Sequence, residues 1–167
     1  VLEVIEEVVQ SVYNVFNWLW FDRRTQKIKV RIDKSDTWSM DSTLAQVILP
    51  MLKQLNASKH GAPNVDMEDV PKNLRATTKQ LQVYSSNGDL DPNHFNRWNW
   101  ILGEMIWAFE QKCRDDWEGA YYKYENDPTA QFGLKLLWED KEGRAAHQER
   151  MSNGFKLFGK YYENLWD

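Results

Sequence analysis

The chain has 167 residues, which is the size of one domain, and a net charge of −4 with lysine and arginine spread along it. This charge balance argues against nucleic acid as a main partner, because binding to a phosphate backbone depends on clustered cations. The single cysteine, Cys113, excludes an internal disulfide. We expect a single domain over residues 1–167.

Aromatic residues take an unusual share of the composition, with nine Trp, seven Tyr and seven Phe making 14% of the chain. Rings of this size fill a core quickly, so the simplest interpretation is a bulky, ring-packed interior. The alternative is that some rings form a platform on which a ligand or a partner's side chain stacks. The composition leaves both interpretations open.

Residues 1–20, VLEVIEEVVQSVYNVFNWLW, carry apolar side chains at helical spacing and predict an amphipathic helix. Glu3, Glu6 and Glu7 argue against a secretory signal, which opens with positive charge. They also argue against a helix lying on a membrane surface, whose polar face carries Lys and Arg. No stretch of the sequence is long and apolar enough for a membrane span. We therefore expect this helix to pack against the rest of the domain.

Two segments have the alternating pattern of a strand. KIKVRID, residues 27–33, alternates charged and β-branched residues, and QFGLKLLWE, residues 131–139, places Leu134, Leu136 and Trp138 on one face. We expect these two segments to pair in a small sheet of two or three strands. Together with the helices below, they predict an α+β fold that is predominantly α-helical, with about four helices.

The segment SMDSTLAQVILPMLKQL, residues 39–55, predicts a helix whose first-turn amides are capped by Ser39 or Asp41. Pro50 lies inside this pattern and predicts a kink about one turn earlier, because proline lacks an amide donor and crowds the preceding carbonyl. The expected buried stripe consists of Leu44, Val47, Ile48, Met51 and Leu55.

Residues 56–92 carry Gly, Pro, Asn, Asp and Ser at the density of a long polar loop. A connection of this length inside a compact domain is either functional or partly disordered. Within it, MEDVPKNLRATTKQLQVY, residues 67–84, predicts one short helix. His60 lies in the turn KHGAP, where a surface role and contact with a ligand are both open.

The next helix opens at DPNHFNRWNW, residues 91–100, and carries apolar residues around most of its circumference. This pattern is typical of a helix central to the fold. Glu104 lies inside it, beside Trp100 and Trp107. A carboxylate in such a place must be paired, hydrogen-bonded or protonated, because burial of an unpaired charge is costly.

The last predicted helix, EGRAAHQERMSNGFKLFGKYYENLWD, begins near Glu142. Gly154 and Gly159 are poor helix formers, and we expect them to allow another backbone or ring to approach closely. Its apolar stripe extends back by one turn to His147. The stripe consists of Met151, Phe155, Phe158, Tyr162 and Leu165.

The sequence offers several partners for Glu104: Asp41, His94, Arg97, His147 and Arg150. One hypothesis is a buried salt bridge or hydrogen-bond network, for example with Arg150 or His147, that holds helices in register. The other is a pocket with tryptophan walls, lined by these polar groups. A metal centre is disfavoured, because no His-x-x-x-His, Glu-x-x-His or paired-cysteine spacing is present.

The candidate ligand-binding residues are polar or aromatic side chains next to apolar helix faces or in the long loop: Trp38, Asp41, His60, Trp100, Glu104, Trp107, His147 and Arg150. We predict no metal and no cofactor. The chain has no nucleophile elbow, P-loop or dinucleotide fingerprint, which weighs against an enzyme without excluding one.

Three long segments, beginning KIKVRIDKSDTWSMD, HFNRWNWILGEM and HQERMSNGFKLF, resemble in the same order segments of a family of uncharacterised small proteins of tailed bacteriophages, including T4-like and marine phages. The chain closely resembles this family from about Lys27 to its C-terminus, and less so in the N-terminal helix and from Asp116 to Asp140. The family has no established activity, so the resemblance implies context only. That context is a phage product in the cytoplasm of a bacterial host, or in the virion.

Three classes of function follow from these observations. The first is a phage accessory protein that binds a small ligand, such as a nucleotide signal, or a host protein in the bacterial cytoplasm. The second is a virion or assembly component, which fits a homo-oligomer. The third is a hydrolase that uses Asp41, Glu104 and His147 as an acid, base or metal set, provided that their side chains converge.

Overall fold

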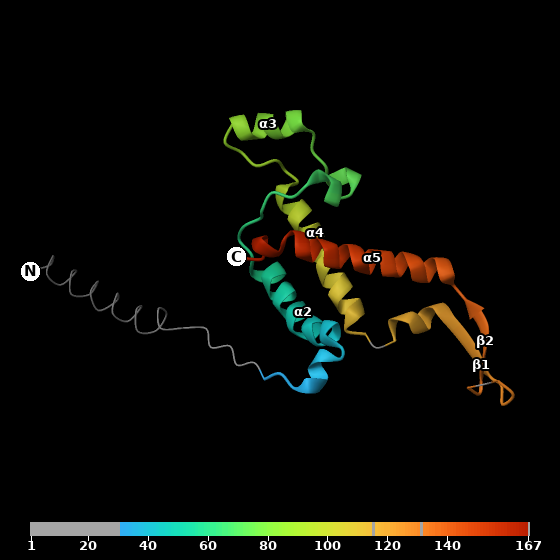
Figure 1. Cartoon of the computed structure of the whole chain (residues 1–167). Helices are drawn as coiled ribbons and strands as arrows, with labels where there is room; N and C mark the ends of the chain where they lie inside the picture. Colours follow the sequence, from blue (N-terminus) through green and yellow to red (C-terminus); the bar gives the residue numbers. More distant parts are fainter. Residues whose placement is uncertain (1–30, 115, 131, 167) are drawn as a thin grey trace, which may run out of the picture. The chain divides into compact units, whose positions relative to one another are not determined.

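The structure is a computed structural model that describes residues 31–114, 116–130 and 132–166. The chain divides into two compact units, Val1–Ser35 and Asp36–Asp167. The helices and strands in Figure 1 that are discussed below belong to the second unit.

Two predicted elements fall wholly or mostly in the first unit. The amphipathic helix predicted for residues 1–20 lies outside the described residues and stays a prediction. The predicted strand 27–33 is described only from Arg31 to Asp33, and that part has no strand conformation.

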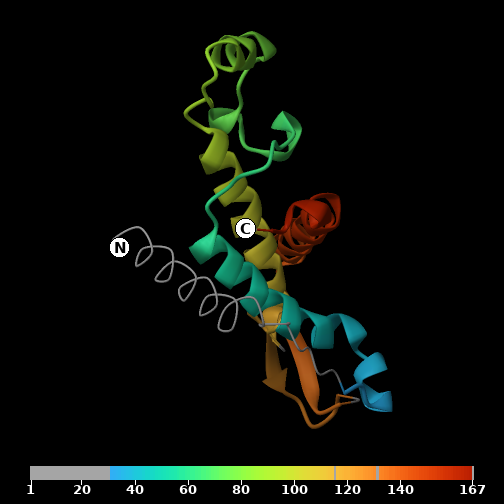
Figure 2. The ribbon, with the colours of Figure 1, turned by 90° about the vertical axis from the view of Figure 1, so that its left-hand side faces the viewer.

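The second unit is built around α4 (His94–Lys112), which contacts both α2 (Met40–Ser58) and α5 (Lys141–Lys160), as Figures 1 and 2 show. The side chains of Trp98 and Leu102 are fully buried in the core. The predicted central helix is therefore confirmed. The described part of the chain is mostly helical, with α2 to α5 and one two-stranded hairpin, and none of its helices is long and apolar enough to span a membrane.

The sequence predicts that either Ser39 or Asp41 caps the first turn of α2, and the structure supports Asp41. The side chain of Ser39 makes no capping hydrogen bond. The carboxylate of Asp41 accepts a hydrogen bond of 2.9 Å from the backbone N–H of Ser42, so the predicted role of Asp41 is confirmed. The helix continues through Pro50 to Ser58.

α2 turns a different face toward the core from the one that the sequence predicts. Ala45 and Leu52 are buried, whereas Leu44, Val47 and Met51 are exposed. The predicted stripe is therefore wrong for those three residues. The apolar arc of α2 is wider than the surface that α4 covers, so one edge of the arc remains in solvent.

α4 and α5 approach closely at Gly154, as predicted. A Cβ atom at this position would lie 2.4 Å from the Cβ atom of Ala108 and 2.7 Å from the carbonyl oxygen of Glu104. Gly159 has open space around it, so the same prediction is wrong there. Tyr162, predicted in the α5 stripe, is 66% exposed because α5 ends at Lys160 and the chain turns away.

The predicted polar loop 56–92 holds short helical turns and α3 (Thr78–Ser86), the one short helix that the sequence predicts. Thr77 caps α3 and forms a capping box with Gln80. Val65 and Val70 are buried in the core and anchor this region to it.

A hydrogen-bond network ties the same region to the end of α5. The Tyr161 hydroxyl accepts from the backbone N–H of Asp66 at 2.9 Å and donates to the Asp69 carboxylate at 2.6 Å. Lys160 pairs with the carboxylates of both Asp66 and Asp69. Burial and the hydrogen bond to Asp69 raise the pKa of Tyr161 to about 12, so the phenol keeps the proton that it donates.

A buried ion pair closes the N-terminal end of α4. The guanidinium of Arg97 donates to both oxygens of the Asp91 carboxylate and, at 3.0 Å, to the backbone carbonyl of Leu74. Both side chains are almost fully buried. Next to them, Nε2 of His94 donates to the carbonyl of Ala62 at 2.9 Å.

The described strands form an antiparallel hairpin, β1 (Tyr122–Asn126) and β2 (Leu134–Glu139), with a bulge between Lys123 and Tyr124. The strand predicted in 131–139 is thus present, and its described partner is β1. The predicted pairing with 27–33 stays a prediction, because residues 27–30 lie outside the described residues. The connection between β1 and β2 is short, so pairing them costs less loop-closure entropy than pairing across a hundred residues.

Candidate functional site

Four of the predicted site residues lie together where α4 meets α5. Glu104 and Trp107 come from α4, and His147 and Arg150 come from α5, one turn apart on the same face. The Arg150 guanidinium donates two hydrogen bonds to the Glu104 carboxylate, at 3.0 and 2.7 Å. Glu104 is 13% exposed and Arg150 is 49% exposed, so solvent reaches the pair from the arginine side.

The rest of this cluster consists of rings packed against each other. The Arg150 guanidinium lies 3.9 Å from the centre of the Trp107 ring. The imidazole of His147 stacks on Trp117 at a centroid distance of 4.7 Å and contacts Trp107 at 4.9 Å. The Tyr121 hydroxyl lies 2.8 Å from Nδ1 of His147.

The position of His147 restricts the chemistry that it can perform. Burial, with the positive charges of Arg114 and Arg150, holds the pKa of its imidazole below the ordinary value. Its Nε2 atom is buried and has no hydrogen-bond partner among the described residues. A neutral ring with one nitrogen bonded to Tyr121 and the other sealed from solvent is poorly placed to exchange protons with a substrate.

The geometry favours the first of the two hypotheses for Glu104, a network that holds helices in register. Of the indole rings expected as pocket walls, Trp107 contacts His147 and Arg150 instead of enclosing a space. The cluster therefore fixes α4, α5 and the 3₁₀ helix Trp117–Tyr121 against one another, and through that helix it positions β1.

The other predicted site residues lie elsewhere. Trp38 is 86% exposed, and Trp100 is partly buried against the core. Asp41 pairs with Lys112 at the end of α4, and this hydrogen bond lowers the pKa of its carboxyl. His60 lies exposed in the segment after α2.

Asp41, Glu104 and His147 have no hydrogen-bond partner in common. Their partners are Lys112, Arg150 and Tyr121, respectively. The described residues also contain no group of three or more His, Cys, Asp or Glu side chains able to hold a metal ion.

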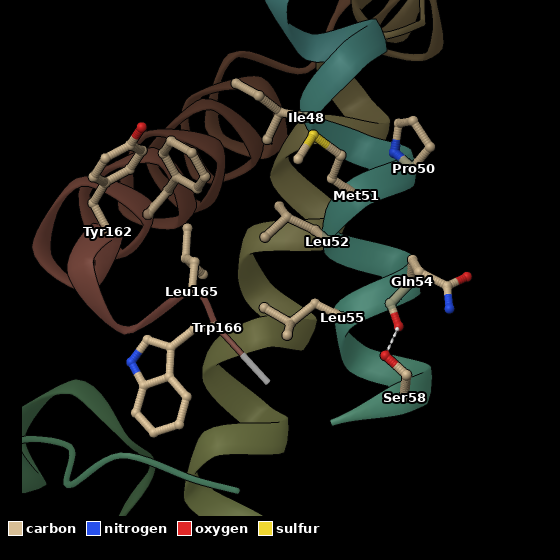
Figure 3. Close-up of a pocket in the computed structure, with 11 residues that line it drawn as sticks. Ile48, Pro50, Met51, Leu52, Gln54, Leu55, Ser58, Tyr162, Leu165 and Trp166 are labelled. Carbon is tan, nitrogen blue, oxygen red and sulfur yellow. Dashed lines mark hydrogen bonds between the residues drawn. The ribbon is translucent and has the colours of Figure 1, made fainter. Parts of the chain in front are cut away.

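An apolar groove, which the sequence did not predict, lies beside α2. It has a volume of about 800 Å³ and lies between α2 and the chain that follows α5, as Figure 3 shows. Its walls are Ile48, Pro50, Met51, Leu52, Gln54, Leu55, Ser58, Phe158, Tyr162, Leu165 and Trp166. Met51, Tyr162 and Trp166 at its rim are each at least 60% exposed.

None of the described residues that line this groove is charged. Its polar side chains are Gln54, Ser58 and Tyr162, and the Ser58 hydroxyl already donates to the backbone carbonyl of Gln54 at 3.0 Å. The wide apolar arc of α2 and the rings in YYENLWD at the C-terminus were the available signals. Neither shows from sequence alone that the two surfaces face each other.

The outer surface of α2 continues the groove toward the N-terminal end of the helix. Met40, Leu44, Val47 and Met51 are exposed and form the α2 stripe, a row with successive spacings of four, three and four residues. Asp41 and Lys53 are the only charged residues of α2, and they pair with Lys112 and Glu110 of α4.

No family model, curated protein or solved structure matches the chain.

Proposed function

We propose that this protein acts by binding a partner protein, and that it receives an apolar helical segment of that partner in the groove between α2 and the C-terminal chain. The observation that carries this proposal is the groove itself, about 800 Å³ in volume, with exposed Met51, Tyr162 and Trp166 at its rim. Grooves of this kind receive the apolar face of an amphipathic helix.

The lining distinguishes a protein segment from a nucleotide or another charged small molecule. A pocket for such a ligand combines apolar walls with convergent polar or charged groups. This groove has no Lys, Arg or His, and the backbone amides of α2 are engaged within the helix. The described lining of the groove therefore offers no cationic donor for a phosphate, whereas its methionine and aromatic rim suits apolar side chains.

The α2 stripe enlarges the surface that supports the proposal. Interface centres are depleted of charged residues and enriched in Met and aromatic side chains. Both charged residues of α2 form ion pairs with α4. The exposed face of α2 therefore consists of Met40, Leu44, Val47 and Met51 with uncharged neighbours. A face of this composition is more consistent with a binding surface than with a solvated one.

The resemblance to phage proteins suggests where such binding takes place. We propose a phage accessory protein in the cytoplasm of the bacterial host, with a host or phage protein as partner. The virion or assembly component remains the second candidate, and the same apolar face supports it. The hydrolase is the weakest candidate, because Asp41, Glu104 and His147 are each engaged with a different partner.

A thermal-shift comparison tests the proposal. The probe is a short amphipathic helical peptide with Leu and Met at heptad spacing, set against a scrambled peptide of the same composition and against nucleotides and cyclic nucleotides. A ligand at 100 times its Kd adds about 2.7 kcal/mol to stability, which raises the midpoint by several degrees. We expect the helical peptide alone to raise it.

The variant Met51→Glu supplies the control. Met51 is 63% exposed, so the fold tolerates the change, but a carboxylate at the groove rim should abolish the peptide-induced shift. A nucleotide that raises the midpoint while the helical peptide does not would overturn the proposal. A peptide shift that Met51→Glu leaves unchanged would place binding outside the groove.

A further inference from the structure

We infer that the partner on this face is a second copy of the same chain, with the α2 helices of the two copies packed antiparallel about a two-fold axis. The inference rests on the proposed function, because it names the occupant of the same surface. Three independent features support it: the spacing of the exposed apolar residues of α2, the placement of the charges of α2, and the position of Trp38 just before α2.

The spacing of the α2 stripe is symmetric about its midpoint, so it is the same from either end of the helix. Met40, Leu44, Val47 and Met51 are separated by four, three and four residues, so the midpoint of the row falls between Ala45 and Gln46. A two-fold axis through that midpoint places Met40 opposite Met51 of the second copy, and Leu44 opposite Val47. Such a contact is isologous, because each residue meets a partner that meets it in return.

The same spacing is that of a heptad seam, in which apolar residues alternate steps of three and four. Over eleven residues the row is about 16 Å long at 1.5 Å per residue. Side chains at such positions interdigitate with those of a neighbouring helix at a small crossing angle. The stripe therefore fits a second helix along its length better than it fits a compact ligand.

The charges of α2 are compatible with self-pairing. A surface that meets a copy of itself brings like charges close to the axis unless it has none there. Asp41 and Lys53 are held by Lys112 and Glu110 of α4, which leaves the stripe free of charge. The neighbours on its outer side, Thr43, Pro50 and Gln54, are uncharged.

Trp38 and the groove become complementary in this arrangement. Trp38 precedes Met40 by two residues and is 86% exposed. In an antiparallel pair it lies past Met51 of the second copy, toward Gln54 and Leu55, which line the groove. An indole that enters an apolar groove is a typical interface hot spot, so each copy would fill the groove of the other.

The test is the native mass of the full chain, measured by sedimentation over a range of concentrations. We expect a mass twice that of one chain at high concentration and dissociation on dilution. Leu44→Glu and Val47→Lys should each raise the dimer Kd at least about 100-fold, because each buries an unpaired charge against an apolar side chain. Trp38→Ala should raise it at least about tenfold. Gln46→Glu adds the same charge to a different face of α2 and should leave the Kd unchanged.

Mixing two variants tests the antiparallel register. A heterodimer of a Leu44→Glu chain and a Val47→Lys chain places the new carboxylate opposite the new ammonium group at one contact and leaves the other contact apolar. We expect the mixture to recover dimer that neither variant forms alone. In a parallel pair residue 44 faces residue 44, so a Leu44→Glu chain would recover dimer better with a Leu44→Lys chain than with a Val47→Lys chain, and that result would overturn the arrangement.

The remaining outcomes separate this inference from the proposed function. A monomer that still binds the helical peptide through Met51 overturns the dimer and keeps the proposed function. A monomer that binds no peptide overturns both. A monomer that binds the peptide only after removal of residues 1–30 would assign the face to the chain's own N-terminal segment and overturn the dimer.

Discussion

α2 and α4 are both 19 residues long and rich in apolar side chains, but they are buried to very different extents. α4 has buried residues on every turn from His94 to Gln111, including the large side chains of Trp98 and Arg97. α2 buries Ala45 and Leu52, with other apolar residues half-buried around them.

The difference comes from the number of neighbours. α4 contacts α2 and α5, and the region before it covers its N-terminal end through the bonds of Arg97 to Leu74 and of His94 to Ala62. α2 has extensive helix contact with α4 alone among the described helices. An apolar stripe is buried only where another element covers it, and the described elements leave the α2 stripe exposed.

The largest change in the free energy of unfolding should follow from breaking the buried Asp91–Arg97 ion pair at the start of α4. Arg97→Met leaves the Asp91 carboxylate buried without its cation, and we expect a loss of about 3–5 kcal/mol in the free energy of unfolding. Urea denaturation measures it. The matched change on α2, Lys53→Met, breaks the solvent-exposed pair with Glu110 and should cost no more than about 1 kcal/mol.

The double variant Asp91→Asn/Arg97→Met separates the charge from the packing. It removes the unpaired carboxylate and should recover much of the lost stability. Equal losses for Arg97→Met and Lys53→Met would contradict the contrast between the two helices.

Acid should reduce the stability that the Asp91–Arg97 ion pair contributes. The hydrogen bonds from Arg97 hold the pKa of the Asp91 carboxyl below its value in the unfolded chain, about 3.9. The unfolded chain therefore takes up this proton first, so stability is complete above about pH 4 and falls as the pH drops through the folded-state pKa. We expect Asp91→Asn to flatten the acid limb of a plot of urea midpoint against pH. An acid limb that Asp91→Asn leaves unchanged would contradict this assignment.

A smaller effect is expected where α4 and α5 cross. Gly154→Ala places a methyl group against Ala108 and the Glu104 carbonyl, and overpacking of this kind costs about 1–3 kcal/mol. Gly159→Ala, on the open side of the same helix, should raise stability by up to about 1 kcal/mol through helix propensity. Chemical denaturation measures both changes in the free energy of unfolding. A loss for Gly154→Ala and a gain for Gly159→Ala would confirm the close approach at Gly154.

The smallest effect should come from the α2 stripe in the monomer. Val47 is 57% exposed, so Val47→Thr should change the free energy of unfolding by less than about 0.5 kcal/mol at a protein concentration too low for association. Thermal denaturation at high dilution measures it. A loss above about 1 kcal/mol would show that this face is packed within the monomer, and the contrast with α4 would fail.

The sequence determined the positions of α2, α4 and α5, the short helix before α4, and the need for a partner at Glu104. Helical periodicity and turn residues are local properties, so they can be recognised without knowledge of the fold. The carboxylate inside an apolar helix also pointed to a partner on another element, because an unpaired charge there would be too costly.

Only the tertiary structure decided which partners meet. Arg150 pairs with Glu104, and not His147, because α4 and α5 approach closely at Gly154. β2 pairs with β1, whose Tyr, Lys and Glu residues give a weaker apolar alternation than residues 27–33. The exposed side of α2 and the groove beside Trp166 depend on contacts between segments about a hundred residues apart. Such contacts leave no periodic signal in the chain, because periodicity shows which residues share a face but not what covers it.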